Sequence, residues 1–249
     1  MVRLARAVGF DPVRFAHALP SILAFYMQFR RYRHENTNRH FQAALGDVYP
    51  ILHEANESAG STGHYFHQDL WAARKIFERR PLSHLDVGSR IDGLISHLLV
   101  FMSVTAVDIR PMRQKVSGLN FVCDDATYLG TFGDNSAESI SSLHAAEHFG
   151  LGRYGDQIDA NACFRFMDAL QRVLAPGGRL YFSVPIGRER VEFNAHRVFS
   201  ADTILRHFER LGLVSFSFIG DDGETVLNAC PADIPAADVG CGLFEFTKA

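Results

Sequence analysis

The chain has 249 residues and a formal net charge of -3, and 21% of its residues are charged. These values exclude the basic excess of a dedicated nucleic-acid binder, so we expect no nucleic-acid partner. The four cysteines form no C-x-x-C pair that would indicate a zinc or redox motif. Free, widely spaced cysteines fit a reducing compartment, and we expect a cytoplasmic protein.

The N-terminal part, residues 1–80, is predicted to be a helical extension or lid on an α/β domain of residues 81–249. An apolar run at 18–27 contains Pro20 and is far shorter than the roughly 20 residues of a membrane span. Arg30, Arg31 and Arg33 follow this run. They indicate either a solvated helix end or a peripheral contact with an anionic membrane.

From residue 82 onward, short apolar strands alternate with helical patterns. The sequence predicts strands at 82–87, 104–109, 119–123, 139–143, 179–184, 214–219 and 243–248, and helices at 93–100, 160–174 and 200–211. A Pro176-Gly177-Gly178 turn precedes the fifth strand. Repeated strand-helix-strand units predict a doubly wound α/β fold with a seven-stranded, mostly parallel sheet.

Acidic residues and a glycine lie where the first three strands end. Asp86 and Gly88 end the first strand, where the backbone of an α/β sheet can approach a ligand closely. Asp108 ends the second strand about twenty residues on, the spacing at which a carboxylate accepts hydrogen bonds from ribose hydroxyls. Asp125 follows the third strand and either binds an adenine amino group or forms a turn or helix cap.

In this order, the segments resemble the class I S-adenosylmethionine-dependent methyltransferase superfamily. The resemblance rests on segments 85–90, 107–108, 125–126, 134–136, 142–148 and 174–178 and spans residues 82–220. It implies an antiparallel last strand and S-adenosylmethionine as the cofactor, lying across the ends of the first two strands. The implied cofactor contacts are Asp86, Gly88, Arg90, Asp108, Ile109, Asp125, Ala126 and His144.

Arg90 departs from the superfamily pattern, because many members carry a second glycine at this position. Its guanidinium could pair with the methionine carboxylate of the cofactor, since a planar fork suits bidentate carboxylate recognition. The alternative is an ordinary surface arginine.

Three further segments resemble an uncharacterised methyltransferase-like family associated with surface-polysaccharide biosynthesis. They are Gly-His-Tyr-Phe-His-Gln-Asp-Leu-Trp at 63–71, Phe-Gly-Leu-Gly-Arg-Tyr-Gly-Asp at 149–156 and Phe-Asn-Ala-His-Arg at 193–197. This resemblance implies a small-molecule or glycan substrate. The hypothesis is methylation of an oxygen on a sugar, nucleotide sugar or glycan intermediate.

Methyl transfer to a hydroxyl needs alignment and a base, and a neutral imidazole suits the second role. His144, His148 and His196 are the candidate bases, because they follow strands at the ligand-binding end of the sheet. The candidate substrate contacts are Glu147, Tyr154, Asn194 and Arg197. Each of these side chains could instead stabilise its own loop.

Two other functions remain open from the sequence. His144-Ala-Ala-Glu147-His148 matches the H-x-x-E-H pattern of inverted zinc peptidases, but it directly follows an apolar strand, whereas that pattern needs a helix. We therefore expect no metal site. The second alternative is a non-catalytic subunit of the same fold that binds a nucleotide or glycan, which the arginine at position 90 would permit.

Overall fold

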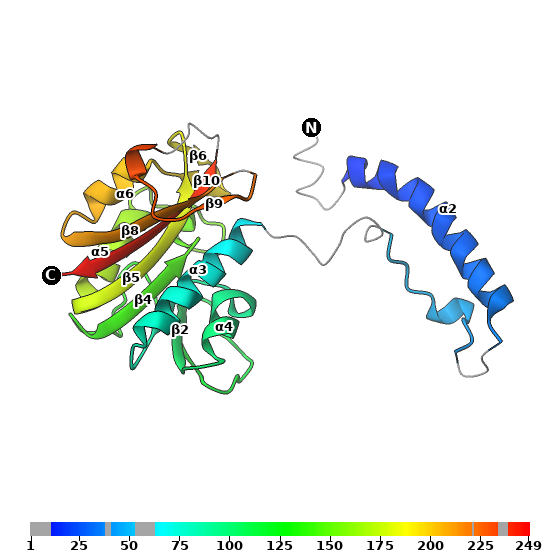
Figure 1. Ribbon diagram of the computed structural model, residues 1–249, viewed down its shortest axis with the longest axis horizontal. Helices are drawn as coiled ribbons and strands as arrows, with labels where there is room; N and C mark the ends of the chain where they lie inside the picture. Colours follow the sequence, from blue (N-terminus) through cyan, green and yellow to red (C-terminus); the bar gives the residue numbers. More distant parts are fainter. Residues whose placement is uncertain (1–10, 38–40, 53–62, 221, 234–238) are drawn as a thin grey trace. The chain divides into compact units, whose positions relative to one another are not determined.

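The structure, a computed structural model, describes residues 11–37, 41–52, 63–220, 222–233 and 239–249 (Figure 1). The chain is divided into two compact units, Met1–Ser61 and Thr62–Ala249. Within the first unit, the described elements are helix α2 (Pro12–Glu35) and the helical turn η1 (Leu45–Asp47). None of the helices in the described ranges is both long and apolar enough to cross a membrane.

The second unit contains a mixed sheet of eight strands in the order β3-β2-β1-β4-β5-β10-β8-β9. Strands β1 to β5 run parallel, and β10 runs antiparallel to both of its neighbours, as the superfamily resemblance implies. The strand bounds are β1 Leu85–Val87, β2 Val104–Asp108, β3 Leu119–Cys123, β4 Ala137–Leu143, β5 Leu174–Ile186, β8 Leu211–Ile219, β9 Thr225–Val226 and β10 Gly240–Lys248. The seven predicted strands are confirmed, and the eighth, β9, is a two-residue strand at the sheet edge.

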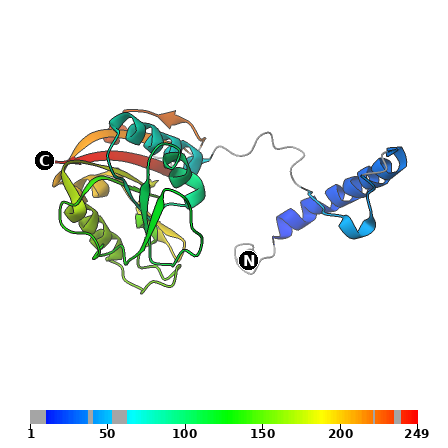
Figure 2. The same ribbon diagram turned by 90° about the horizontal axis from the view of Figure 1, so that it is seen from below.

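Helices cover both faces of the sheet, so the doubly wound prediction is also confirmed. One face carries α3 (His64–Arg79), the irregular turn η2 (Ile91–Ile95) and α4 (Ser96–Leu98), and the other carries α5 (Ala162–Val173) and α6 (Ala201–His207). Figure 2 shows the cyan helix α3 and the yellow-green helix α5 on opposite sides of the red strand β10. Each face of the sheet has its own hydrophobic core, and successive residues of β5 point alternately into one or the other. Tyr181 packs under α3, and Phe182 packs under α5 and α6.

The predicted Pro176-Gly177-Gly178 turn appears as a protrusion within β5. Leu174 pairs with Ala137 of β4, whereas Arg179 pairs with Ser139, so the residues between them leave the ladder. Proline has no N–H to donate, and Gly177 has a φ of 74°, which glycine adopts without strain. The local sequence therefore accounts for the break in pairing.

Helix α3 belongs to the sheet unit, although the sequence placed the domain boundary near residue 80. Its apolar face is partly in the core: Ala73 and Ile76 are buried on the sheet, and Trp71 contacts Tyr181 edge-on at 6.1 Å between ring centroids. Phe66 and Phe77, at 47% and 50% exposure, remain outside that core. Burial of this face makes α3 part of the same core, and whether residues 1–61 act as a lid stays a prediction.

Two smaller features complete the second unit. The hairpin of β6 (Arg190–Glu192) and β7 (His196–Val198) follows β5, and the turn η3 (Ala146–His148) follows β4. Because β1 to β4 are parallel, their carboxyl ends and the loops after them meet at one edge of the sheet. All four cysteines are free thiols, with Cys163 and Cys241 buried.

Candidate functional site

A cleft of about 1770 Å³ lies at the carboxyl ends of β1 to β4, within the second unit. Helix α3 lines part of it through Tyr65, Gln68 and Asp69. The structure therefore brings together nine of the residues predicted from the sequence. They are Gly88, Arg90, Asp108, Ile109, Asp125, Ala126, His144, His148 and Tyr154.

The turn after β1 is shaped by a buried carboxylate and a glycine. Asp86 is fully buried and accepts hydrogen bonds from the Ser89 N–H (3.1 Å) and the Ser141 hydroxyl, and its burial raises its pKa to about 6. Gly88 has a φ of 81°, and a Cβ at this position would lie 2.9 Å from Cβ of Ala145. Asp86 therefore stabilises the turn after β1 from inside the protein and does not line the cleft. Gly88 allows the backbone of this turn to reach the cleft.

Asp108 ends β2 at the cleft, as predicted, but both of its oxygens already have a partner. Arg110 donates to Oδ1 from its backbone N–H (2.8 Å) and Nε (2.9 Å), and to Oδ2 from Nη2 (2.7 Å). Partial burial alone would raise the pKa of Asp108, but the hydrogen bonds from Arg110 hold it below its ordinary value. The side chain of Asp108 is therefore ionised, and a ribose bound here would share its oxygens with Arg110.

Arg90 lies at the cleft but pairs with a neighbour on the same turn. Its Nε and Nη2 donate to the two carboxylate oxygens of Asp92 at 2.9 and 2.6 Å, and the pair is exposed to solvent. Opposite this turn, Asp69 of α3 approaches Gly93 so closely that a Cβ there would lie 2.5 Å from Asp69 Oδ2. Gly93 thus makes room for Asp69, whose pKa burial raises to about 6.

Asp125 forms the local turn that the sequence allowed, and it also lies at the cleft. Its Oδ1 accepts hydrogen bonds from the backbone N–H (2.9 Å) and the hydroxyl (2.6 Å) of Thr127, which is a local turn. Asp125 also lines the cleft together with Ala126 and, from the end of β2, Ile109. The neighbouring Asp124 accepts from the Thr131 N–H and is absent from the lining.

His144 lies at the end of β4 with both ring nitrogens engaged. Nδ1 is 2.9 Å from Glu147 Oε1, and Nε2 is 3.2 Å from Cys241 Sγ. Burial alone would lower the pKa of His144, but Cys241 and Glu147 together raise it well above the ordinary histidine value. A protonated, enclosed imidazole is a poor proton acceptor, so His144 is the weakest of the three predicted bases.

His148 has the opposite character. Its Nδ1 lies 2.7 Å from the carbonyl oxygen of Ala195, so Nδ1 carries the proton and the lone pair of the neutral ring is on Nε2. Burial lowers the pKa of His148, although Glu147 and the Ala195 carbonyl act against this shift. The ring is therefore neutral near pH 7 with its accepting nitrogen defined, which suits a general base at the cleft.

Glu147 and Arg197, both predicted to contact substrate, are buried behind the cleft lining. Glu147 is 1% exposed, and its Oε2 has no hydrogen-bond partner within the described ranges. Arg197 is 8% exposed and donates to the carbonyl oxygens of Phe149 (2.6 Å), Glu147 (3.4 Å) and Ala160 (3.4 Å). The predicted substrate contact is not supported for either, because packing directs Arg197 to loop carbonyls and Glu147 to histidine.

The segment 149–156 forms a tight loop at the cleft. The Asp156 carboxylate accepts from the backbone N–H groups of Gly150 (2.8 Å), Gly152 (3.2 Å) and Tyr154 (3.2 Å). A Cβ at Gly150, whose φ is 75°, would collide with the Asp159 carbonyl, so this position requires glycine. The loop exposes the Tyr154 ring between the guanidinium groups of Arg110 (4.7 Å) and Arg153 (5.2 Å).

The third motif, 193–197, lies outside the cleft lining and contacts it through the Ala195 carbonyl at His148. His196 is absent from the lining, but its ring lies 6.5 Å from the His148 ring, and its Nε2 is 3.8 Å from Glu192. Asn194 is exposed and does not line the cleft. Ala195, between them, supplies the carbonyl that orients His148.

The zinc-peptidase pattern does not form its required helix. His144 directly follows β4 with a φ of 49°, and within 144–148 only Ala146–His148 form a short helical turn. His144 Nδ1 is hydrogen-bonded to Glu147 Oε1 at 2.9 Å. Within the described ranges, no cluster of histidine, cysteine and acidic side chains has metal-binding geometry.

Several cleft residues were not predicted as site residues. Arg110 lies two residues beyond Asp108, so the Asp-x-Arg spacing was a readable signal. Gln68 is 2% exposed and accepts from the Ser183 hydroxyl (2.7 Å), which in turn accepts from the His144 N–H (3.1 Å). Gln68 and Asp69 lie in the motif at 63–71, but no local pattern places that motif at this edge of the sheet. Cys241, behind the lining at His144, also comes from a strand distant in sequence.

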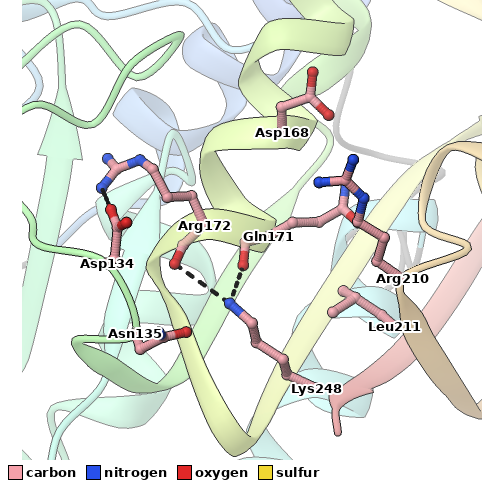
Figure 3. Close-up of a pocket in the computed structure, with 8 residues that line it drawn as sticks. All are labelled: Asp134, Asn135, Asp168, Gln171, Arg172, Arg210, Leu211 and Lys248. Atoms are coloured by element: carbon pink, nitrogen blue, oxygen red, sulfur yellow. Dashed lines mark hydrogen bonds and ion pairs between the residues drawn. The ribbon is translucent and has the colours of Figure 1, made fainter.

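A second, smaller pocket of about 410 Å³ lies where α5 ends and β8 begins (Figure 3). Two of its three cations are engaged: Lys248 Nζ donates to the carbonyl oxygens of Gln171 (2.7 Å) and Leu174 (2.8 Å), and Arg172 pairs with Asp134 (2.7 Å). The bonds from Lys248 satisfy carbonyl oxygens at the end of α5. Lys248 therefore has a structural role in this pocket.

Comparisons with known proteins agree with this architecture. The profile of a family described as "Caenorhabditis protein of unknown function, DUF268" matches residues 96–218, just under half of the chain. No curated protein matches the sequence.

Several solved structures are similar to this chain. The N-methyltransferase NodS from Bradyrhizobium japonicum WM9, in complex with S-adenosyl-L-homocysteine, has a TM-score of 0.53 at 15% identity over 90% of this chain and 97% of that one. The [4+2]-cyclase SpnF has a TM-score of 0.53 at 14% identity over 76% and 84%. The 1,6-didemethyltoxoflavin-N1-methyltransferase of Burkholderia thailandensis has 0.51 at 15% identity over 73% and 78%. At these identities the likeness concerns architecture, and the chain has the Rossmann-like methyltransferase fold.

Proposed function

We propose that this protein is an S-adenosylmethionine-dependent methyltransferase that methylates an oxygen of a sugar, nucleotide sugar or glycan intermediate. The observation that carries the methyltransferase assignment is the cleft at the ends of β1 to β4, with Gly88 and Asp108 on its floor. The sugar or glycan acceptor is supported by the family resemblance of segments 63–71, 149–156 and 193–197. Segments 149–156 and 193–197 surround His148, and segment 63–71 lines the same cleft through Tyr65, Gln68 and Asp69.

The residues of the cleft fit this cofactor. Gly88 leaves space that a Cβ would fill, Asp108 is ionised and can accept from ribose hydroxyls, and Asp125 keeps a second carboxylate oxygen beside Ala126. Two similar structures, NodS and the toxoflavin-pathway methyltransferase, were solved with S-adenosylhomocysteine. When bound, the cofactor supplies an electrophilic methyl group on a sulfonium that leaves as a neutral thioether.

The protein's own part in the reaction is alignment and proton removal. The cleft residues would hold the acceptor hydroxyl in line with the methyl group that the bound cofactor supplies. The hydroxyl proton passes to Nε2 of His148, whose Nδ1–H is held by the Ala195 carbonyl. Glu147, 3.8 Å from Nε2, stabilises the imidazolium that results.

A non-catalytic binding role is the second candidate. Arg110 occupies both oxygens of Asp108, and Arg90 stands where many methyltransferases have glycine. The similarity to the [4+2]-cyclase SpnF also illustrates that this fold serves more than methyl transfer. Cofactor affinity separates the two candidates.

The test is a calorimetric titration of S-adenosylmethionine into the wild-type chain and Asp108→Ala. We expect the variant to bind about tenfold more weakly or worse, because hydrogen bonds to a charged group contribute roughly 1.5–3 kcal/mol. The matched control is Asp202→Ala, which removes an exposed carboxylate outside the cleft and should leave the affinity unchanged. If the wild-type chain fails to bind at millimolar cofactor, the methyltransferase proposal is wrong.

A further inference from the structure

The arginines of the cleft divide into paired and unpaired groups. Five arginines line it: Arg90, Arg110, Arg113, Arg153 and Arg165. Three of them pair with carboxylates, which belong to Asp92, Asp108 and Asp159. In the part of the chain that the structure describes, Arg113 and Arg153 have no carboxylate within ion-pair distance.

Arg153 stands directly beside the candidate base. Its Nη1 donates to the Ala195 carbonyl oxygen at 3.1 Å, and the same oxygen lies 2.7 Å from His148 Nδ1. The Tyr154 ring supports both groups, because the Arg153 guanidinium lies 5.2 Å from its centroid and the His148 ring meets it edge-on at 5.6 Å. Guanidinium and imidazole are therefore anchored to the same two neighbours.

The remaining donors of Arg153 are free for a ligand. A guanidinium has five N–H donors in a rigid fork, and only one is used by Ala195. The acidic groups nearby are already committed: Asp156 accepts three backbone N–H groups, and Glu147 is buried against His144. The fork matches the geometry of a phosphate or carboxylate.

We propose that the methyl acceptor carries an anionic group, a phosphate or a carboxylate, which binds Arg153 and so places the acceptor hydroxyl at His148. This inference rests on the proposed function and narrows its substrate class. Arg113, the other unpaired arginine of the cleft lining, adds positive charge to the same cleft and favours an anion further. Neutral sugars and unmodified glycans are then poor acceptors.

The test uses calorimetry on the full chain saturated with S-adenosylhomocysteine. Pyrophosphate is the phosphate probe and glucuronate the carboxylate probe. We expect at least one of them to bind, and Arg153→Gln to weaken that binding about tenfold, with Arg153→Lys in between. The matched control Arg74→Gln, on the exposed side of α3 and outside the cleft lining, should bind like the wild type.

A second readout is the pKa of His148, which is measured by NMR of its imidazole ring. His148 is faced by Glu147, Arg153, His144 and His196, and an anion on Arg153 adds negative charge to this set. The probe should raise the pKa of His148 in the wild type and leave it unchanged in Arg153→Gln. The inference is overturned if neither probe binds the wild type, or if Arg153→Gln binds equally well.

A parallel titration with S-adenosylhomocysteine alone reports on the proposed function. If the cofactor product does not bind, the methyltransferase proposal fails, and the probe titrations on the unloaded chain still decide whether Arg153 binds an anion. If it binds but the probes do not, only the inference about the acceptor fails.

Discussion

At the scale of single residues, two histidines four positions apart have opposite protonation behaviour. His144 faces Cys241 and Glu147 inside the protein, and these two groups raise its pKa, whereas burial lowers the pKa of His148 although Glu147 and the Ala195 carbonyl act against that shift. The protonation of each ring is set by its surroundings and not by the H-x-x-E-H spacing. Of these two histidines, His148 is the one suited to accept a proton near pH 7.

His148→Gln is expected to lower kcat by roughly 10²–10⁴-fold, the usual contribution of a general base. In the wild type, the acid limb of kcat/KM should fall at a pH below the ordinary histidine value of 6.5, because a lowered pKa keeps the ring unprotonated to lower pH. A pH–rate profile measures both. An equal loss in the control His196→Gln, or an acid limb above 6.5, would assign the base elsewhere.

A chain of buried hydrogen bonds joins Ser139, His84, Ser141 and Asp86 below the turn at Gly88, and we expect it to contribute to stability. Burial lowers the pKa of His84 to about 3, so its ring is neutral. The Ser141 hydroxyl donates to Asp86 and must accept from His84 Nε2–H (2.8 Å), which leaves His84 Nδ1 to accept from Ser139 (2.8 Å). One set of protons therefore satisfies the whole chain.

Ser141→Ala should lower the free energy of unfolding by about 1–3 kcal/mol, because it leaves Asp86 and His84 with an unmet hydrogen bond each. The adjacent Ser142 is the matched control: it is equally buried in β4, and its hydroxyl has no partner among the described residues. Ser142→Ala should be neutral or stabilising. Urea denaturation of the two variants measures the difference, and equal losses would contradict the network.

At the scale of secondary-structure elements, the sheet brings three distant sequence segments to one site. Helix α3 contributes Gln68 and Asp69, the loop after β4 contributes Tyr154, and the turn before β7 contributes the Ala195 carbonyl. Each segment contains one of the three motifs at 63–71, 149–156 and 193–197. Their common location gives these motifs a physical reason to occur together.

The C-terminal end of α5 provides a prediction at this scale. Lys248 of β10 donates to the carbonyl oxygens of Gln171 and Arg172 in the last turn (Figure 3) and to that of Leu174 just after it. Lys248→Met should cost about 2 kcal/mol of unfolding free energy, since hydrogen bonds from a charged donor and its favourable interaction with the helix dipole are lost. Lys115→Met, at an exposed position, should change it by less than about 0.5 kcal/mol. Thermal denaturation compares the two variants, and equal shifts would argue against the cap.

At the scale of the whole molecule, the core and the cleft both lie within Thr62–Ala249. A chain that starts at Thr62 should therefore fold with the melting temperature of the sheet unit and bind S-adenosylhomocysteine with unchanged affinity. Calorimetry and thermal denaturation check this against the full chain. A clear loss of cofactor affinity would support the lid role predicted for the extension, while its predicted membrane contact through Arg30, Arg31 and Arg33 needs a separate vesicle-binding measurement.

Sequence alone determined the order of strands and helices, the kink at Pro176-Gly177-Gly178 and the positions of Gly88, Asp108 and His148 at one sheet edge. These follow from local patterns, because strand alternation and chain direction set which residues end a parallel strand. Only the tertiary structure decided that Arg110 covers Asp108, that Glu147 and Arg197 are buried, and that α3 belongs to the cleft. Such outcomes depend on which distant side chains compete for the same donor or acceptor, and packing alone settles that competition.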